Sequence, residues 1–129
     1  MDEITKRLKG SPSRDEFKVH HKRLPPDLYA CDLDFILVAK RPLRIVAFLD
    51  YKIDGDSISF SEIIAYNSLL NIAPVFIVLG QAETGSFDIL RYVDGDPLPY
   101  PPISHLVPIA KCVSWREFAD WERELRRNN

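Results

Sequence analysis

Apolar and polar residues alternate in blocks along the chain, and the blocks predict an order of strands and helices. Apolar runs bounded by polar or turn-forming residues are typical of strands. The run before Gly80 is almost entirely apolar, which favours a strand covered on both faces. Four strands are predicted, at residues 35–39, 44–49, 75–79 and 87–93. A short strand near residues 28–31 is a weaker candidate.

Three helices are predicted from Ser residues followed three positions later by Glu, which is the pattern of an N-terminal capping box. They begin at Ser13, Ser59 and Ser114. The first extends to about residue 23 and the second to about residue 71. The first helix is expected to bury a stripe made of Phe17, His21 and Leu24, and the third carries Trp115, Phe118, Trp121 and Leu125 on one face.

This order of elements indicates an α/β fold with a mixed central β-sheet flanked by helices. Two neighbouring antiparallel strands are followed by a strand–helix–strand crossover, which requires a parallel pair. A chain of 129 residues fits one domain over residues 1–129. The segment 97–108 contains five prolines and is expected to form a stiff loop over the fold, with a polyproline ligand for a partner as the alternative.

Candidate chemistry lies where two of the predicted strands meet. Asp34 opens the strand 35–39, and Asp50 closes the strand 44–49. If the two strands pair as a hairpin, the start of one lies beside the end of the other, so the two carboxylates share one edge of the sheet. Lys52 lies two residues after Asp50 and therefore on the same face.

Two carboxylates this close repel each other, and burial of either one costs free energy. A divalent cation removes this cost, and carboxylate oxygens are ligands that Mg²⁺ prefers. A lysine beside such a cation can hold a water molecule or stabilise charge that develops on a phosphate. The arrangement therefore suits hydrolysis of a phosphodiester.

The pattern resembles the PD-(D/E)XK nuclease superfamily, in which an acid opens one strand and a (D/E)-x-K motif ends the next. Asp34 matches the first acid, and Asp50-Tyr51-Lys52 matches the motif, although Leu33 stands where many members have proline. The helix after Ser59 and the strand before Gly80 continue the resemblance. Over about residues 13–93 the chain is similar to the αβββαβ restriction-endonuclease-like core of small archaeal and phage Holliday-junction-resolvase-like members, with residues 97–127 as a C-terminal loop and helix.

The resemblance implies a magnesium-dependent nuclease, with Mn²⁺ able to replace Mg²⁺. Asp34, Asp50 and the backbone carbonyl of Tyr51 would bind the metal. Lys52 would orient or activate the attacking water. Glu16, on the first helix, is the candidate for an outer ligand, with helix capping as its alternative role. Asp32 and the His20-His21 pair are left open as further members of the site.

The charge distribution adds candidates for nucleic-acid contacts. Residues 1–44 carry ten Lys and Arg against seven Asp and Glu, whereas residues 45–129 carry seven against twelve. A cationic N-terminal part can contact phosphates, although an ordinary solvated helix face is the alternative. We expect nucleic acid as the partner, with DNA favoured, and leave a homodimer open. The candidate contacts are Lys18, His21, Lys22, Arg23, Lys40, Arg41 and Arg44.

Other features narrow the function class. No apolar run is long enough to span a membrane, and the charged N-terminus is unlike a secretory signal, so a cytoplasmic location without a membrane partner is expected. Cys31 and Cys112 form no metal-binding pattern and are expected to be free thiols. The alternative to an enzyme is a catalytically inactive nuclease-fold module that binds or scaffolds a partner.

Overall fold

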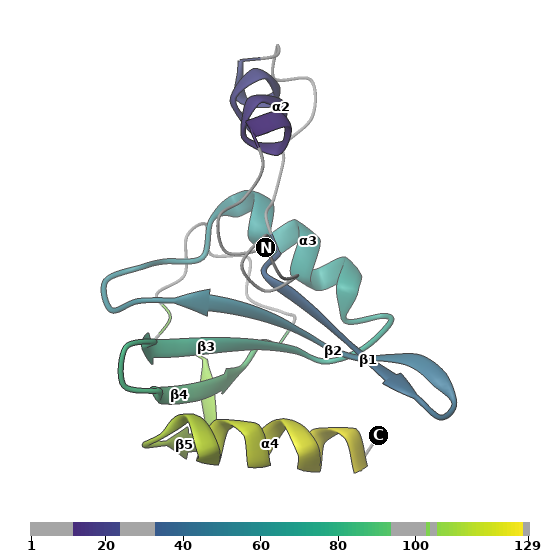
Figure 1. The fold of residues 1–129 in the computed structure, drawn as a ribbon, viewed down its shortest axis with the longest axis vertical. Coiled ribbons are helices and arrows are strands. Elements are labelled where there is room, and N and C mark those ends of the chain that lie inside the picture. Colours follow the sequence, from purple (N-terminus) through teal and green to yellow (C-terminus); the bar gives the residue numbers. More distant parts are fainter. Residues whose placement is uncertain (1–11, 24–32, 94–102, 104–105, 128–129) are drawn as a thin grey trace.

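The computed structural model describes residues 12–23, 33–93, 103 and 106–127. Its centre is a five-stranded mixed sheet, with the strands in sequential order (Figure 1). Only β2 and β3 run parallel, and the other neighbours are antiparallel. The strands are β1 (Phe35–Lys40), β2 (Leu43–Lys52), β3 (Val75–Gln81), β4 (Ser86–Arg91) and β5 (Val107–Cys112).

The predicted α/β class and the mixed sheet are therefore confirmed. The strands at 35–39 and 44–49 pair antiparallel as β1 and β2, with Phe35 opposite Leu49. The strand at 75–79 lies in the same sheet as β3, parallel to β2, and helix α3 (Phe60–Leu69) makes the connection between them. The weaker strand near residues 28–31 lies outside the described residues.

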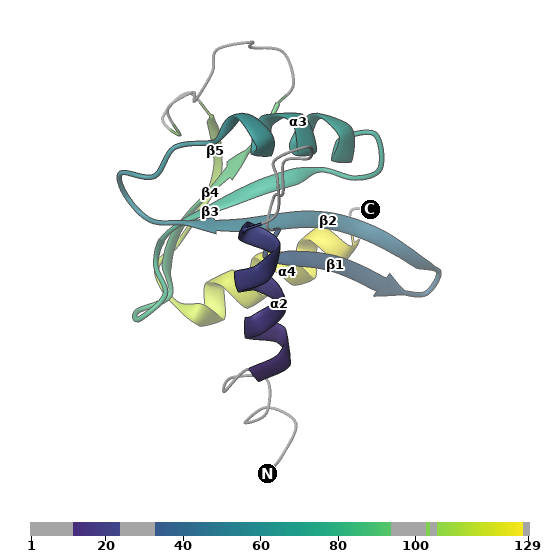
Figure 2. The same ribbon diagram turned by 90° about the horizontal axis from the view of Figure 1, so that it is seen from above.

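Helices α3 and α4 (Trp115–Arg127) cover opposite faces of the sheet (Figures 1 and 2). Alternate strand residues therefore belong to two separate cores, as the two-residue period of a strand requires. Phe48, Val75 and Ile77 pack on the α3 side with Tyr66. The α4-side core contains the intervening strand residues and three side chains of α4: Ala47, Leu49, Phe76, Val78, Phe87, Ile89, Phe118, Trp121 and Leu125.

The sequence did not predict β5. Residues up to 108 were expected to form a loop because proline lacks the amide hydrogen that a strand ladder uses. Pro108 nevertheless lies in β5, opposite Leu90 and beside an irregularity in the register. The strand is at the edge of the sheet, where proline is tolerated because one side of the backbone has no partner strand.

Helix α2 (Pro12–Lys22) differs from its prediction in position and burial. Figure 1 shows it standing apart from the sheet. Phe17 is 71% exposed and stacks on His21 rather than on the sheet, so the expected burial of this stripe is wrong for these two residues. Leu24 lies outside the described residues. The helix begins with Pro12 in its first turn, a favoured position for proline, so Ser13 lies within the helix and does not precede it.

Candidate active site

Asp34 and Asp50 meet at the edge of the sheet, as the hairpin predicts. Asp50 lies in β2 and is 3% exposed. Asp34 immediately precedes β1, and its Oδ2 accepts a hydrogen bond of 2.7 Å from the backbone N–H of Tyr51. Tyr51 lies beyond the last residue of β2 that pairs with β1, so this bond occupies a backbone N–H that β1 leaves open and fixes the Asp34 carboxylate next to Asp50.

The environment of Asp50 is unfavourable for a negative charge. Burial, together with the nearby Asp34 carboxylate, raises the pKa of Asp50 from its ordinary 3.8 to about 7. The hydroxyl of Tyr66 donates a hydrogen bond to Oδ2 of Asp50, and this bond and the nearby Lys52 ammonium act in the opposite direction. The surrounding protein groups therefore stabilise the negative charge of Asp50 less than water would.

Lys52 lies on the same face of β2 and points toward α3. Its Nζ contacts both carboxylate oxygens of Glu62, at 3.1 and 2.9 Å. The two side chains are only 11% and 14% exposed, so water screens the pair little. Lys52 and the hydrogen bond from Ser59 lower the pKa of Glu62 against the opposing effect of burial, so Glu62 is ionised and holds the ammonium in place.

Glu62 and Tyr66 are the members of this cluster that sequence reasoning missed. Glu62 was interpreted only as the Glu of the capping box, and that role is confirmed: its Oε1 accepts from the backbone N–H of Ser59 at 2.9 Å. Its Oε2 also accepts from the Tyr66 hydroxyl at 3.1 Å. The available signal was the four-residue spacing, which places a carboxylate and a phenol on one face of a helix beside the apolar Ile63.

The cluster fits a hard divalent cation. The two carboxylates could serve as ligands, because magnesium sites commonly use one or two carboxylates and complete their coordination with water or substrate phosphate. In the part of the chain that the structure describes, no group of three or more His, Cys, Asp or Glu residues could hold a metal ion.

The structure does not bring Glu16 to this cluster. Glu16 is exposed on α2, which stands apart from the sheet in Figure 1, and its role as an outer metal ligand stays a prediction. Lys18, His21 and Arg23 are exposed on the same helix, and the side chain of Lys22 lies outside the described residues. Contacts of these residues with nucleic acid remain a prediction.

The other predicted basic residues lie at the far end of the hairpin. Lys40 and Arg41 are exposed at the turn between β1 and β2. This turn is about 20 Å from Asp34 at the usual rise of about 3.3 Å per strand residue. Arg44 donates a hydrogen bond of 3.3 Å to the carbonyl of Arg126 near the end of α4. These cations therefore lie too far away to contact a small ligand at Asp34 and Asp50, and their contacts with nucleic acid remain a prediction.

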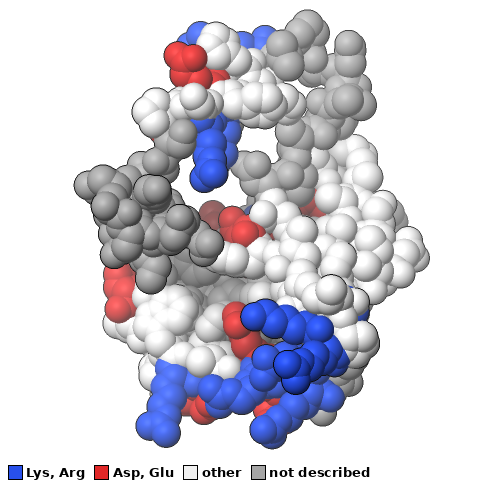
Figure 3. Space-filling model, turned by 45° about the vertical axis from the view of Figure 1, so that its right-hand side comes forward, with Lys and Arg blue, Asp and Glu red and all other residues white. Residues whose placement is uncertain are grey.

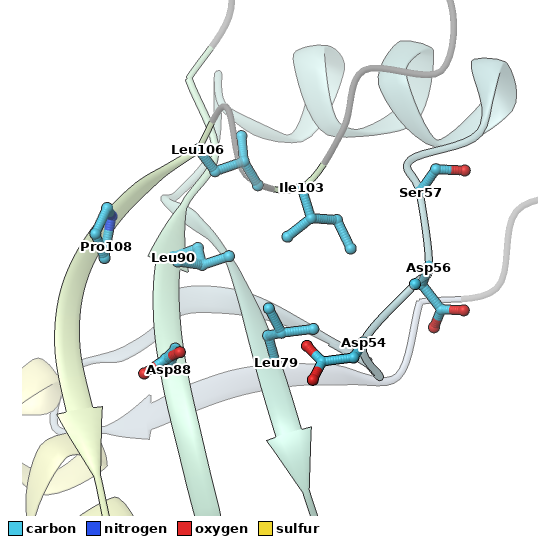
Figure 4. A pocket seen from close by; sticks show the side chains of 10 residues that line it. Asp54, Asp56, Ser57, Leu79, Asp88, Leu90, Ile103, Leu106 and Pro108 are labelled. Carbon is cyan, nitrogen blue, oxygen red and sulfur yellow. The ribbon is translucent and has the colours of Figure 1, made fainter.

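A separate cavity of about 630 Å³ lies on the α3 side, with an apolar floor and carboxylates at its rim (Figure 4). Asp54 and Asp56 belong to a tight turn. Gly55 has a φ of +92°, and Oδ2 of Asp56 accepts from the backbone N–H of Ile53 at 3.0 Å. The described residues that line this cavity include no group of three or more that could hold a metal ion.

Comparisons with protein-family models, curated proteins and solved structures find no match to this chain. No described helix has the length and apolar character needed to cross a membrane. Cys112 is a buried free thiol, as predicted, and Cys31 lies outside the described residues.

Proposed function

We propose that this protein is a magnesium-dependent nuclease that hydrolyses phosphodiester bonds of nucleic acid, with DNA favoured. The observation that supports the proposal is the juxtaposition of Asp34 with the buried Asp50 beside Lys52. A buried carboxylate next to a second one is costly for a fold, and a bound cation would relieve the cost. The scaffolding alternative offers no comparable reason for this arrangement.

Each residue of the cluster has a role in the proposed reaction. Asp34, Asp50 and the Tyr51 carbonyl would hold Mg²⁺, which supplies Lewis-acid activation of the phosphate or the water. Lys52 would orient the attacking water or stabilise charge on the phosphate. Glu62 is a positioning residue, because it holds the Lys52 ammonium through two contacts. Tyr66 positions Asp50 through its hydroxyl hydrogen bond.

We also propose a restriction-endonuclease-like αβββαβ core. The order β1, β2, α3, β3 and the parallel pairing of β2 with β3 support it. The first strand of such a core would fall at residues 28–31. An X-ray structure in which these residues pair with β1 would agree with the assignment, and one in which another element occupies that edge would overturn it.

The experiment that tests the function is a cleavage screen with a lysine variant. Purified protein is incubated with labelled single-stranded, duplex and branched DNA and with RNA, in Mg²⁺ or Mn²⁺. Lys52→Ala should reduce turnover about a hundredfold or more, the scale of losing one electrostatic stabiliser. Mn²⁺ affinity should stay nearly unchanged, because an ammonium is not a metal ligand.

Two further variants make the result interpretable. Lys52→Gln retains a hydrogen-bond donor toward Glu62 without the charge, so it should lose turnover while keeping the fold. Lys111→Ala removes an exposed lysine on β5 and should cleave like the parent. A parent protein that cleaves no substrate with either metal would favour the scaffolding alternative. Cleavage preserved in both Lys52 variants would remove Lys52 from the mechanism.

A further inference from the structure

A largely apolar cavity of about 610 Å³ lies on the α4 side of the sheet and reaches the candidate active site. Asp34 is part of its wall, whereas Asp50 and Lys52 point toward α3 on the other face of the sheet. A nucleic-acid strand that occupies both the cavity and the candidate site would therefore pass Asp34 at the start of β1. The volume falls within the range of small-molecule sites. Its wall is rich in aromatic rings: Phe35, Tyr51, Phe87, Trp115 and Phe118.

Two of these rings are exposed, and that of Trp115 also has a defined position. Trp115 is 52% exposed, yet its Nε1 donates a hydrogen bond of 3.0 Å to the carbonyl of Ala82, and its ring meets Phe87 edge-on at 5.1 Å. Phe35 is 58% exposed at the start of β1, directly after Asp34. An exposed ring held in place as that of Trp115 is suits stacking of a flat, partly polar ligand, because little conformational freedom is lost on binding, and Phe35 adds a second exposed ring.

The aromatic cavity continues into a basic groove between α4 and the hairpin. Leu37 and Glu122 line both this cavity and a neighbouring one of about 290 Å³. The second cavity is also lined by Arg126 and by Arg123, which forms an exposed ion pair of 2.9 Å with Asp120. Figure 3 shows a large group of Lys and Arg side chains in the lower part of this face and a second group at its top. The groove thus leads from the acidic site, past aromatic rings, to cations.

We propose that this groove binds an unpaired strand of nucleic acid, with one base in the aromatic cavity beside Asp34 and the adjoining phosphates near Arg123 and Arg126. The proposal rests on the proposed nuclease function and names its substrate class. Aromatic rings that stack bases, followed by cations that track the backbone, are the features with which proteins bind single strands. In a duplex the bases are stacked on each other and cannot enter a cavity of this kind without being flipped out.

Binding of labelled oligonucleotides, measured by fluorescence anisotropy in EDTA, tests the groove apart from catalysis. The parent should bind a single strand more tightly than the matched blunt duplex. Phe35→Ala should weaken single-strand binding about tenfold, since stacking on one aromatic side chain contributes about 1–3 kcal/mol per base. Ile36→Ala is the control, because Ile36 is similarly exposed, neighbours Phe35 on the strand and does not line the cavity.

A second pair of variants tests the arginines of α4 at the other end of the groove. Arg126→Ala should lower the slope of log affinity against log salt by about 0.7, the contribution of one phosphate contact in a single strand. Arg127→Ala removes the same charge from the same turn of α4, but Arg127 does not line the groove, so the slope should change less. Both variants alter exposed side chains and should fold like the parent.

The outcomes separate the inference from the nuclease proposal. Equal affinity for single strand and duplex, or equal affinities of Phe35→Ala and Ile36→Ala, would overturn the inference even if the protein cleaves DNA. Preferential single-strand binding that depends on Phe35 would support the groove even if no metal supports cleavage, and the nuclease proposal alone would then fail.

Discussion

At the scale of single residues, Asp50 has the strongest consequences. Its pKa of about 7 lies above its ordinary 3.8, so the folded metal-free protein binds a proton there more tightly than the unfolded chain. The contribution of Asp50 to stability is therefore greatest below about pH 4. It decreases as pH rises from about 4 to about 7, by on the order of a few kcal/mol, and is constant above that.

Urea unfolding of the metal-free protein between pH 4 and 8 checks this prediction. Asp50→Asn is the matched variant, because its side-chain oxygen still accepts from the Tyr66 hydroxyl without carrying a charge. The difference in stability between variant and parent should grow with pH in favour of the variant, to on the order of 1–3 kcal/mol near pH 8. A difference that does not change with pH would contradict the assignment of the buried charge.

The same substitution should have the opposite effect on metal binding. Asp50→Asn should weaken Mn²⁺ affinity by tenfold or more in calorimetric titration, because a carboxylate ligand is lost. Ser57→Ala, an exposed change outside the cluster, serves as the control. Equal Mn²⁺ affinity in Asp50→Asn and the parent would exclude Asp50 as a ligand. A substitution that raises stability while it weakens function is typical of functional-site residues, whose native side chains cost the fold stability.

The sequence placed Asp34, Asp50 and Lys52 together because strand pairing alone determines their proximity. It did not assign Glu62 and Tyr66, because their contact with Lys52 and Asp50 depends on how α3 packs across the sheet. The capping box already explains Glu62, and the four-residue spacing to Tyr66 indicates a shared helix face but not which strand residues that face contacts. Such contacts between distant elements require tertiary structure.

Among the elements, the turn between β3 and β4 packs directly against the first residue of α4. Gly85 has a φ of +75°, and a Cβ there would lie 2.5 Å from the backbone nitrogen of Trp115. Gly85→Ala should therefore destabilise the protein by about 1–3 kcal/mol, through backbone strain and displacement of α4. Gly55→Ala has a similar φ of +92° with open space around it, so it should cost less.

Urea unfolding of both glycine variants measures the difference. Equal destabilisation by Gly55→Ala and Gly85→Ala would show that only backbone conformation matters and that α4 does not pack closely on the turn. The same comparison tests whether Gly85 fixes the position of Trp115, which lines the aromatic cavity.

Element prediction succeeded where a pattern is enforced by burial and failed where an element is exposed or at an edge. The stripe of α4 was found because Phe118, Trp121 and Leu125 pack on the sheet. The stripe of α2 was misjudged because the same spacing occurs in Phe17 and His21 without a covering partner. Strand β5 was missed because two of its residues before the buried Cys112 are polar or proline, as an edge strand allows.

At the scale of the whole molecule, the two cores meet at the central strands. Ala47, Val75 and Ile77 are fully buried, whereas most residues of β1 and β5 are exposed. Amide hydrogen exchange should therefore be slowest in β2 and β3 and faster in β1 and β5, because exchange of central amides requires global unfolding. Slower exchange in β5 than in β3 would contradict the observed order of strands.

The proposed hydrolysis of phosphodiesters at the Asp34–Asp50 cluster is tested most directly by one assay. Cleavage of labelled single-stranded DNA in Mg²⁺ is compared for the parent and Asp50→Asn at equal concentrations. We expect cleavage by the parent, none without divalent metal, and a loss of about a hundredfold or more in Asp50→Asn despite its greater stability. Cleavage by Asp50→Asn at the parent's rate would show that this cluster is not the active site.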